Sequence, residues 1–120
     1  MGFLKHLAHA ICLLSPALAS AAVSGGEYKL ARDYVFAACL VERYKGSPLE
    51  AEAQTWAGGL IEAGNLPAEA YPVLAKLASR APAASLEPNG VTLRIPGCVD
   101  LIHDKRFESL LKKTLTPFLR

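Results

Sequence analysis

The cysteine pair Cys39 and Cys98 places the strongest constraint on how this chain can fold. A disulfide between them would close a loop of about 60 residues, which the chain-entropy relation values at about 4 kcal/mol. That contribution is comparable with the whole stability of a small domain. The chain has a third cysteine, Cys12, so the pairing depends on the fate of the N-terminal segment.

The N-terminal segment has the layout of a secretory signal peptide. Lys5 gives it a positive start, residues 7–14 are apolar, and the small residues at 17–21 offer two overlapping cleavage sites. The apolar stretch is well short of the roughly 18 residues that a spanning helix needs, so we expect no stable membrane anchor. We predict that residues 1–21 are a signal peptide, removed by cleavage after residue 19 or 21.

Removal of this segment leaves one exported domain over residues 22–120. Cys12 is lost with the signal peptide, and we expect the remaining Cys39 and Cys98 to form one disulfide in an oxidising compartment. The domain keeps 12 of the 13 basic residues and all 11 acidic residues, so its net charge is +1. This balance favours neither nucleic acid nor an anionic membrane surface as a partner.

Helical periodicity dominates the exported domain, because apolar side chains recur at every third or fourth position. The predicted helices cover residues 27–45, 48–63, 67–80, 98–103 and 105–115. Pro72 lies too deep in the third of these for a first-turn position, which predicts a kink or a later start near Tyr71. The fold class is therefore all-α, a small domain of four to five helices with one disulfide.

The second helix has the clearest start signal. Ser47 and Glu50 form a capping-box pattern with a proline at the first helical position. Gly58 and Gly59 lower the helix propensity, which would be offset by close approach of a neighbouring helix. The residues predicted to form its buried face are Leu49, Ala53, Trp56, Ala57, Leu60 and Ile61.

Residues 81–97 interrupt the helical pattern and form a long loop before the last helices. This segment contains three of the eight prolines and the turn signal Asn89-Gly90. Val91, Leu93 and Ile95 alternate along it as in a strand, so the loop can form a short β-hairpin. A loop this long in a small domain is usually functional or disordered, and its alternating apolar residues favour function.

After the loop come four residues that together resemble a reactive site: Cys98, Asp100, His103 and Asp104. On a helix, however, residues five apart point about 140° away from each other, so Cys98 does not face His103. His103 is the only histidine of the exported domain, and a closed zinc site needs about four ligands. We therefore predict no catalytic residue, metal or cofactor, and interpret Asp104 as a cap for the last helix.

The order of these segments resembles the amidase immunity proteins of type VI secretion, specifically the family that neutralises class-four amidase effectors. The resemblance rests on the first helix, from Asp33-Tyr34-Val35 to Cys39, and on the closing segment CVDLIHDK at residues 98–105. It spans residues 32–113, most of the exported domain.

This resemblance implies a periplasmic inhibitor that is not an enzyme, is all-helical and often forms a homodimer. Its partner would be a secreted cysteine–histidine peptidoglycan amidase that cuts the γ-D-glutamyl–diaminopimelate bond of the stem peptide. In the family a protruding loop plugs the enzyme's active-site groove, and residues 81–97 match that loop by position. The predicted contact residues, with Leu93 as an apolar anchor, are Ser85, Glu87, Asn89, Gly90, Val91, Leu93 and Arg94.

Two other functions remain open from the residues alone. One is a periplasmic helical domain with a structural or chaperone-like binding role and no toxin partner. The other is a small hydrolase that uses Cys98 and His103, which would require Cys98 to be a free thiol.

Overall fold

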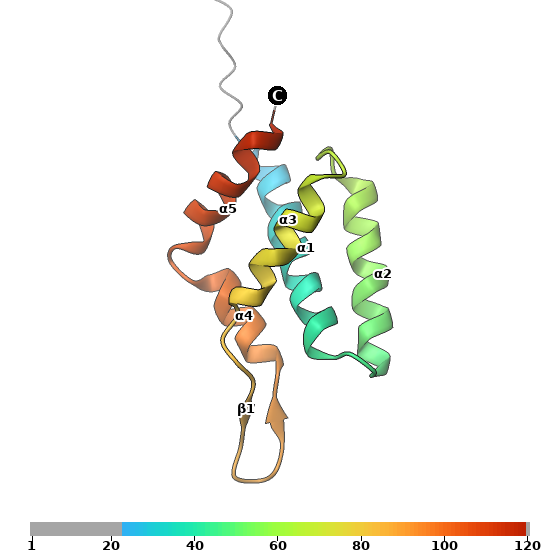
Figure 1. Cartoon of the computed structure of the whole chain (residues 1–120), viewed down its shortest axis with the longest axis vertical. Coiled ribbons are helices and arrows are strands. Elements are labelled where there is room, and N and C mark those ends of the chain that lie inside the picture. Colours follow the sequence, from blue (N-terminus) through green and yellow to red (C-terminus); the bar gives the residue numbers. More distant parts are fainter. Residues whose placement is uncertain (1–22, 120) are drawn as a thin grey trace, which may run out of the picture.

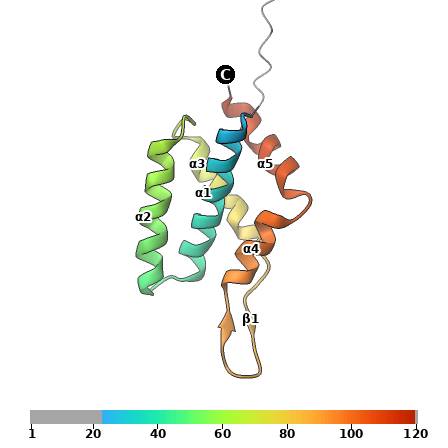
Figure 2. The same cartoon turned by 180° about the vertical axis from the view of Figure 1, so that it is seen from behind.

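The structure is a computed structural model that describes residues 23–119, so the predicted signal peptide over 1–21 lies outside the described residues. Within this range the fold is all-α, as predicted, with five α-helices and a projecting two-stranded hairpin (Figures 1 and 2). The elements are α1 (Gly25–Arg43), α2 (Pro48–Ala63), α3 (Ala70–Leu77), the 3-10 helix η1 (Ala78–Arg80), β1 (Ser85–Leu86), β2 (Thr92–Leu93), α4 (Ile95–His103), α5 (Phe107–Leu115) and the 3-10 helix η2 (Thr116–Phe118).

The central element is α1, which contacts each of the other four α-helices (Figure 1). Its start is capped by Ser24, whose Oγ accepts a hydrogen bond from the backbone N–H of Glu27 at 3.0 Å. This bond satisfies one of the backbone donors that a helix leaves unpaired at its N-terminus. The prediction of a helix over 27–45 is confirmed, with both ends lying two residues earlier in the chain.

The hydrophobic core lies where the inner face of α1 meets α3, α4 and α5. Every buried residue between 23 and 119 is apolar, and no polar or charged side chain is buried there. The largest fully buried side chains of the core are Val35, Cys39, Leu74, Cys98, Phe107, Leu111 and Leu115. Burial of such side chains is worth about 1.5–3 kcal/mol each, so this cluster holds the four helices together.

The capping box predicted for α2 is not formed. Ser47 makes no side-chain bond to the helix, and its Oγ instead donates to the carbonyl oxygen of Tyr44 at 2.8 Å. The Glu50 carboxylate accepts from the backbone N–H of Gly46 at 3.0 Å. The prediction was wrong because the turn that links α1 to α2 offers both side chains closer partners.

The buried face predicted for α2 is also narrower in the structure. Only Ala53 and Leu60 are buried, whereas Trp56 and Ile61 are each 40% exposed. The helix lies at the edge of the bundle, where α1 covers one side of it (Figure 2). A methyl group added at Gly58 or Gly59 would meet no atom within 4 Å. The predicted close approach of a helix at these glycines is therefore wrong.

The third helix starts late, as Pro72 predicted. It begins at Ala70, which places Pro72 at its third residue, within the first turn where proline is tolerated. Tyr71 is buried and meets Tyr34 of α1 edge to face, with ring centroids 5.0 Å apart. This burial raises the pKa of both phenols.

The closing segment divides into two helices at His103, as predicted. However, α4 begins at Ile95, so the last three residues of the predicted loop form its first turn. The predicted cap of α5 by Asp104 is wrong, because the N-cap residue is Arg106 and no side chain caps the helix; Asp104 instead binds the backbone of the turn before α5. Its carboxylate accepts from the N–H of Arg106 at 2.8 Å, and its carbonyl accepts from the N–H of Phe107 at 3.0 Å.

Candidate partner-binding hairpin

The connection between η1 and α4 forms the predicted β-hairpin, which projects from one end of the helical bundle (Figures 1 and 2). The strands pair antiparallel, with Ser85 opposite Leu93 and Leu86 opposite Thr92. A ladder of two residue pairs is short, and isolated two-stranded hairpins are marginally stable in water. The rest of its structure comes from the turn at its tip and from contacts at its base.

The tip is a tight turn whose residues match the geometry they adopt. The N–H of Gly90 donates to the carbonyl of Glu87 at 2.9 Å, which places Pro88 at the second turn position, where its fixed φ is favourable. Gly90 has φ +84°, a left-handed conformation that glycine adopts at no steric cost. The N–H of Val91 also donates to the Asn89 side-chain oxygen at 3.0 Å. The turn predicted from Asn89-Gly90 is therefore confirmed.

The register divides the predicted contact residues between two faces and the tip. Side chains opposite each other share a face of the hairpin, so Ser85, Glu87, Val91 and Leu93 lie on one side. The Ser85 Oγ donates to the Glu87 carboxylate at 3.2 Å along this side. Asn89 and Gly90 form the tip. Arg94 belongs to the opposite face, with its guanidinium 5.7 Å from the centre of the ring of Tyr44, the residue that follows α1.

The hairpin and the first residue of α4 together carry most of the exposed large apolar side chains in the described part of the chain. Leu86 is 74% exposed and Val91 is 51% exposed, and Leu93 and Ile95 are also exposed. Clustered apolar residues on a projecting element are typical of an interaction site. Leu86 and Ile95 were missing from the predicted contacts. A signal for both was present in the sequence. Leu86 lies on the strand that precedes the Asn89-Gly90 turn, and Ile95 continues the alternating apolar series of Val91 and Leu93.

The base of the hairpin is joined to the C-terminal part of α1 by several contacts. The predicted disulfide links Cys39 of α1 to Cys98 of α4, with 5.8 Å between their Cα atoms. The Arg43 guanidinium donates to the carbonyl oxygens of Ala81 and Pro82, at 2.9 and 2.5 Å. These contacts hold both arms of the hairpin, because Ala81 and Pro82 precede β1 and Cys98 follows β2.

The reactive cluster considered in the sequence does not form a site. Cys98 is fully buried in the disulfide, so it is no free thiol. His103 lies exposed at the end of α4. Among residues 23–119, no three His, Cys, Asp or Glu side chains lie together as metal ligands would. Over the same range, no helix has both the length and the apolar character needed to cross a membrane.

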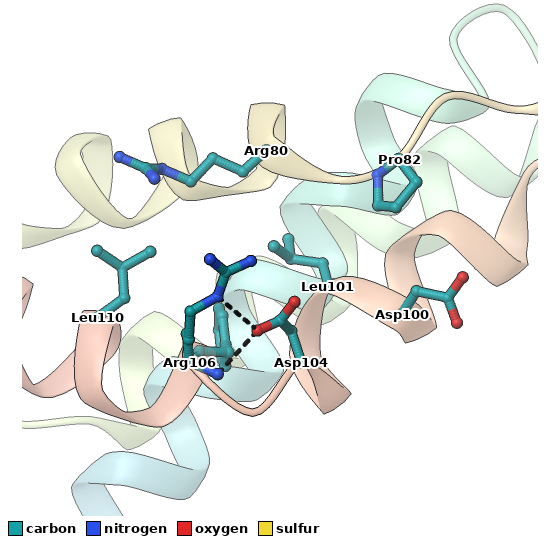
Figure 3. Close-up of a pocket in the computed structure, with 8 residues that line it drawn as sticks. Arg80, Pro82, Asp100, Leu101, Asp104, Arg106 and Leu110 are labelled. Atoms are coloured by element: carbon teal, nitrogen blue, oxygen red, sulfur yellow. Dashed lines mark hydrogen bonds and ion pairs between the residues drawn. The ribbon is translucent and has the colours of Figure 1, made fainter.

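A surface hollow of about 490 Å³ beside the hairpin base is the other candidate site (Figure 3). It lies between Arg80 with Pro82 on one side and the α4–α5 connection on the other. Asp104 and Arg106 form an ion pair across 3.6 Å, and the hydrogen bond from the Arg106 N–H lowers the pKa of Asp104. The charged residues lining the hollow are all exposed, so it has no buried polar group with which to select a ligand.

Comparison with known proteins gives one family match. Residues 29–111 match the family model Tai4, described as type VI secretion system (T6SS) amidase immunity protein. The matched segment begins in α1 and ends in α5, so it includes the disulfide and the whole hairpin. No curated protein matches the chain.

Proposed function

The chain belongs to the family of type VI secretion system amidase immunity proteins, and from this premise we propose that it protects the producing cell by binding and occluding the active site of one secreted peptidoglycan amidase. The enzyme is of the cysteine–histidine type, and it cuts the γ-D-glutamyl–diaminopimelate bond of the stem peptide. The immunity protein acts in the periplasm, where the amidase meets its substrate, after export and removal of residues 1–21.

The projecting hairpin is the observation that carries this proposal. It presents Leu86 and Val91 near its tip, more than half exposed and outside the helical core. An apolar side chain inserted into an enzyme groove is desolvated there, which is the usual setting of a strong contact residue. The hairpin inserts as a preformed element, so binding loses less conformational entropy than the ordering of a free loop would cost.

The test compares apolar-to-serine changes on and off the hairpin. Leu86 and Val91 are replaced together by serine, and the matched control is Val73→Ser on α3, where the valine is 37% exposed. The inhibition constant is measured against the cognate amidase with a γ-D-glutamyl–diaminopimelate stem peptide. We expect the hairpin variant to inhibit at least about 30-fold more weakly, corresponding to about 2 kcal/mol. Inhibition equal to that of the control would refute occlusion by the hairpin.

We further propose that two copies of the chain associate. The support is Trp56 of α2, a large apolar side chain that is 40% exposed at the edge of the bundle. Trp56 also packs edge to face on Phe36 of α1, with ring centroids 6.0 Å apart, so the indole is held in place on the surface. Light scattering should give twice the chain mass, and Trp56→Asp should give the monomer mass. A monomer mass for the unchanged protein contradicts this pairing.

A further inference from the structure

The direction in which the hairpin projects is set from outside the hairpin. Its ladder consists of two residue pairs, and the hydrogen bonds at its tip run between its own residues. Such a short ladder does not fix its own orientation. The element that contacts both arms at the base is the last turn of α1 with Tyr44 after it.

The first arm is held by Arg43. Its guanidinium donates to the successive carbonyl oxygens of Ala81 and Pro82, which lie outside regular secondary structure. The arginine is half-buried, and its bond to Ala81 is partly shielded from water whereas its bond to Pro82 is exposed. Hydrogen bonds from a charged donor are about twice as strong as those between neutral groups. Two such bonds fix both the position and the rotation of the arm.

The second arm is held at Gly97 and Cys98. Gly97 is buried in the first turn of α4, and a Cβ atom added there would lie 3.3 Å from the Arg43 guanidinium and closer still to the Pro82 carbonyl oxygen. The absence of a side chain therefore lets the two arms approach each other under the arginine. The disulfide from Cys98 to Cys39 then fixes this junction to α1 one turn before Arg43.

We propose that Arg43 and Gly97 are positioning residues that hold the hairpin in the direction required for insertion into the amidase, an inference that rests on the proposed function. Neither residue contacts the enzyme. Arg43 ties the entering arm to α1, and Gly97 provides the space in which that tie forms. The base residues thereby act on inhibition through the hairpin.

The test uses Arg43→Ala and the conservative Arg43→Lys in the full exported domain, with Arg80→Ala as the matched control. Arg80 is an exposed arginine on η1 whose side chain extends along the hollow near Leu110 (Figure 3). Backbone order parameters are measured for the amides of Glu87, Gly90 and Val91 and for the helices. We expect Arg43→Ala to lower the hairpin values toward the range below about 0.6 typical of flexible backbone. The helix values and those of the control should stay unchanged.

The second readout is the inhibition constant against the cognate amidase. We expect Arg43→Ala to weaken inhibition at least about tenfold, because the free hairpin must now be ordered on binding. Arg43→Lys keeps a charged donor and should lie between wild type and Arg43→Ala in both readouts. If Arg43→Ala fails to fold, the order parameters and the inhibition constant of Arg43→Lys decide the test. Unchanged hairpin order parameters in a folded Arg43 variant overturn the proposal, as does a uniform loss of order in hairpin and helices.

The two proposals can fail separately. Order parameters are measured without the amidase, so they test the anchoring of the hairpin directly. If the wild-type protein does not inhibit the amidase, the proposed function is refuted. If it inhibits and the Arg43 variants inhibit equally well, the function stands and the positioning role is refuted.

Discussion

The substitution Gly97→Ala reverses the usual effect of replacing a helical glycine. Alanine within a helix is ordinarily more stable than glycine by about 0.5–1 kcal/mol. At Gly97 the new Cβ would lie less than 3.0 Å from the Pro82 carbonyl oxygen, a distance that Cβ atoms in proteins essentially never show. Because the obstacle is backbone, the arm that carries Pro82 must move.

The cost of that movement follows from what Pro82 contacts. Crowding of a packed site costs about 1–3 kcal/mol. The shift also lengthens the hydrogen bond that Pro82 accepts from Arg43, whose Nη1 lies 3.3 Å from the new methyl position. Set against the helix-propensity gain, the net expectation is a loss of about 1–2 kcal/mol in the free energy of unfolding. For a domain of this size each kcal/mol corresponds to about 4–8 °C in Tm.

The assay is urea unfolding followed by far-ultraviolet circular dichroism with the disulfide intact. A pure stability change moves the midpoint and leaves the m-value constant. The matched control is Gly59→Ala in α2, where a methyl group meets nothing within 4 Å. That variant should gain about 0.5–1 kcal/mol. If Gly97→Ala is as stable as the wild type or more stable, the reasoning on the close approach is refuted.

Three further predictions concern the core, the disulfide and acid sensitivity. Leu111→Ala, at a fully buried site, should cost about 2–5 kcal/mol in urea unfolding, and a cost below about 1 kcal/mol would contradict its central place in the core. The double variant Cys39→Ala and Cys98→Ala should lose about 4 kcal/mol in the free energy of unfolding. A reducing agent should lower the Tm of the wild type only; an equal effect on the double variant would show that the disulfide is not the cause. The Arg106 N–H holds the pKa of Asp104 below its usual value of about 3.9, so this contribution is fully present above about pH 4 and is lost as pH falls through the folded-state pKa. Asp104→Asn should therefore flatten the fall in stability below about pH 4, and identical acid profiles would contradict it.

Most of the architecture follows from local sequence patterns. Apolar periodicity locates the helices, and the two cysteines of the exported domain predict the disulfide. The hairpin follows from Asn89-Gly90, because glycine adopts the left-handed conformation that this turn needs without a steric cost. Each of these features depends on residues close in sequence or on covalent chemistry.

The errors arise where distant segments decide the outcome. Trp56 falls on the apolar stripe of α2, but only neighbouring helices determine whether a stripe is covered, and α2 lies at the bundle edge. Ser47 and Glu50 fit a capping box, yet the preceding turn gives them other partners. A sequence shows Arg43 simply as a basic residue at a helix end. Its role emerges only when residues 81–82 are folded against it.

The separation between the hairpin tip and the helical core has an evolutionary consequence. The tip closes on its own hydrogen bonds, and its exposed side chains lie outside the apolar cluster that holds the helices together. Under the proposed function, substitutions at Leu86 and Val91, whose side chains take part in neither the turn hydrogen bonds nor the core, would therefore change which enzyme is recognised at little cost to folding. If the toxin changes, these exposed positions would be free to follow it on a scaffold that stays constant.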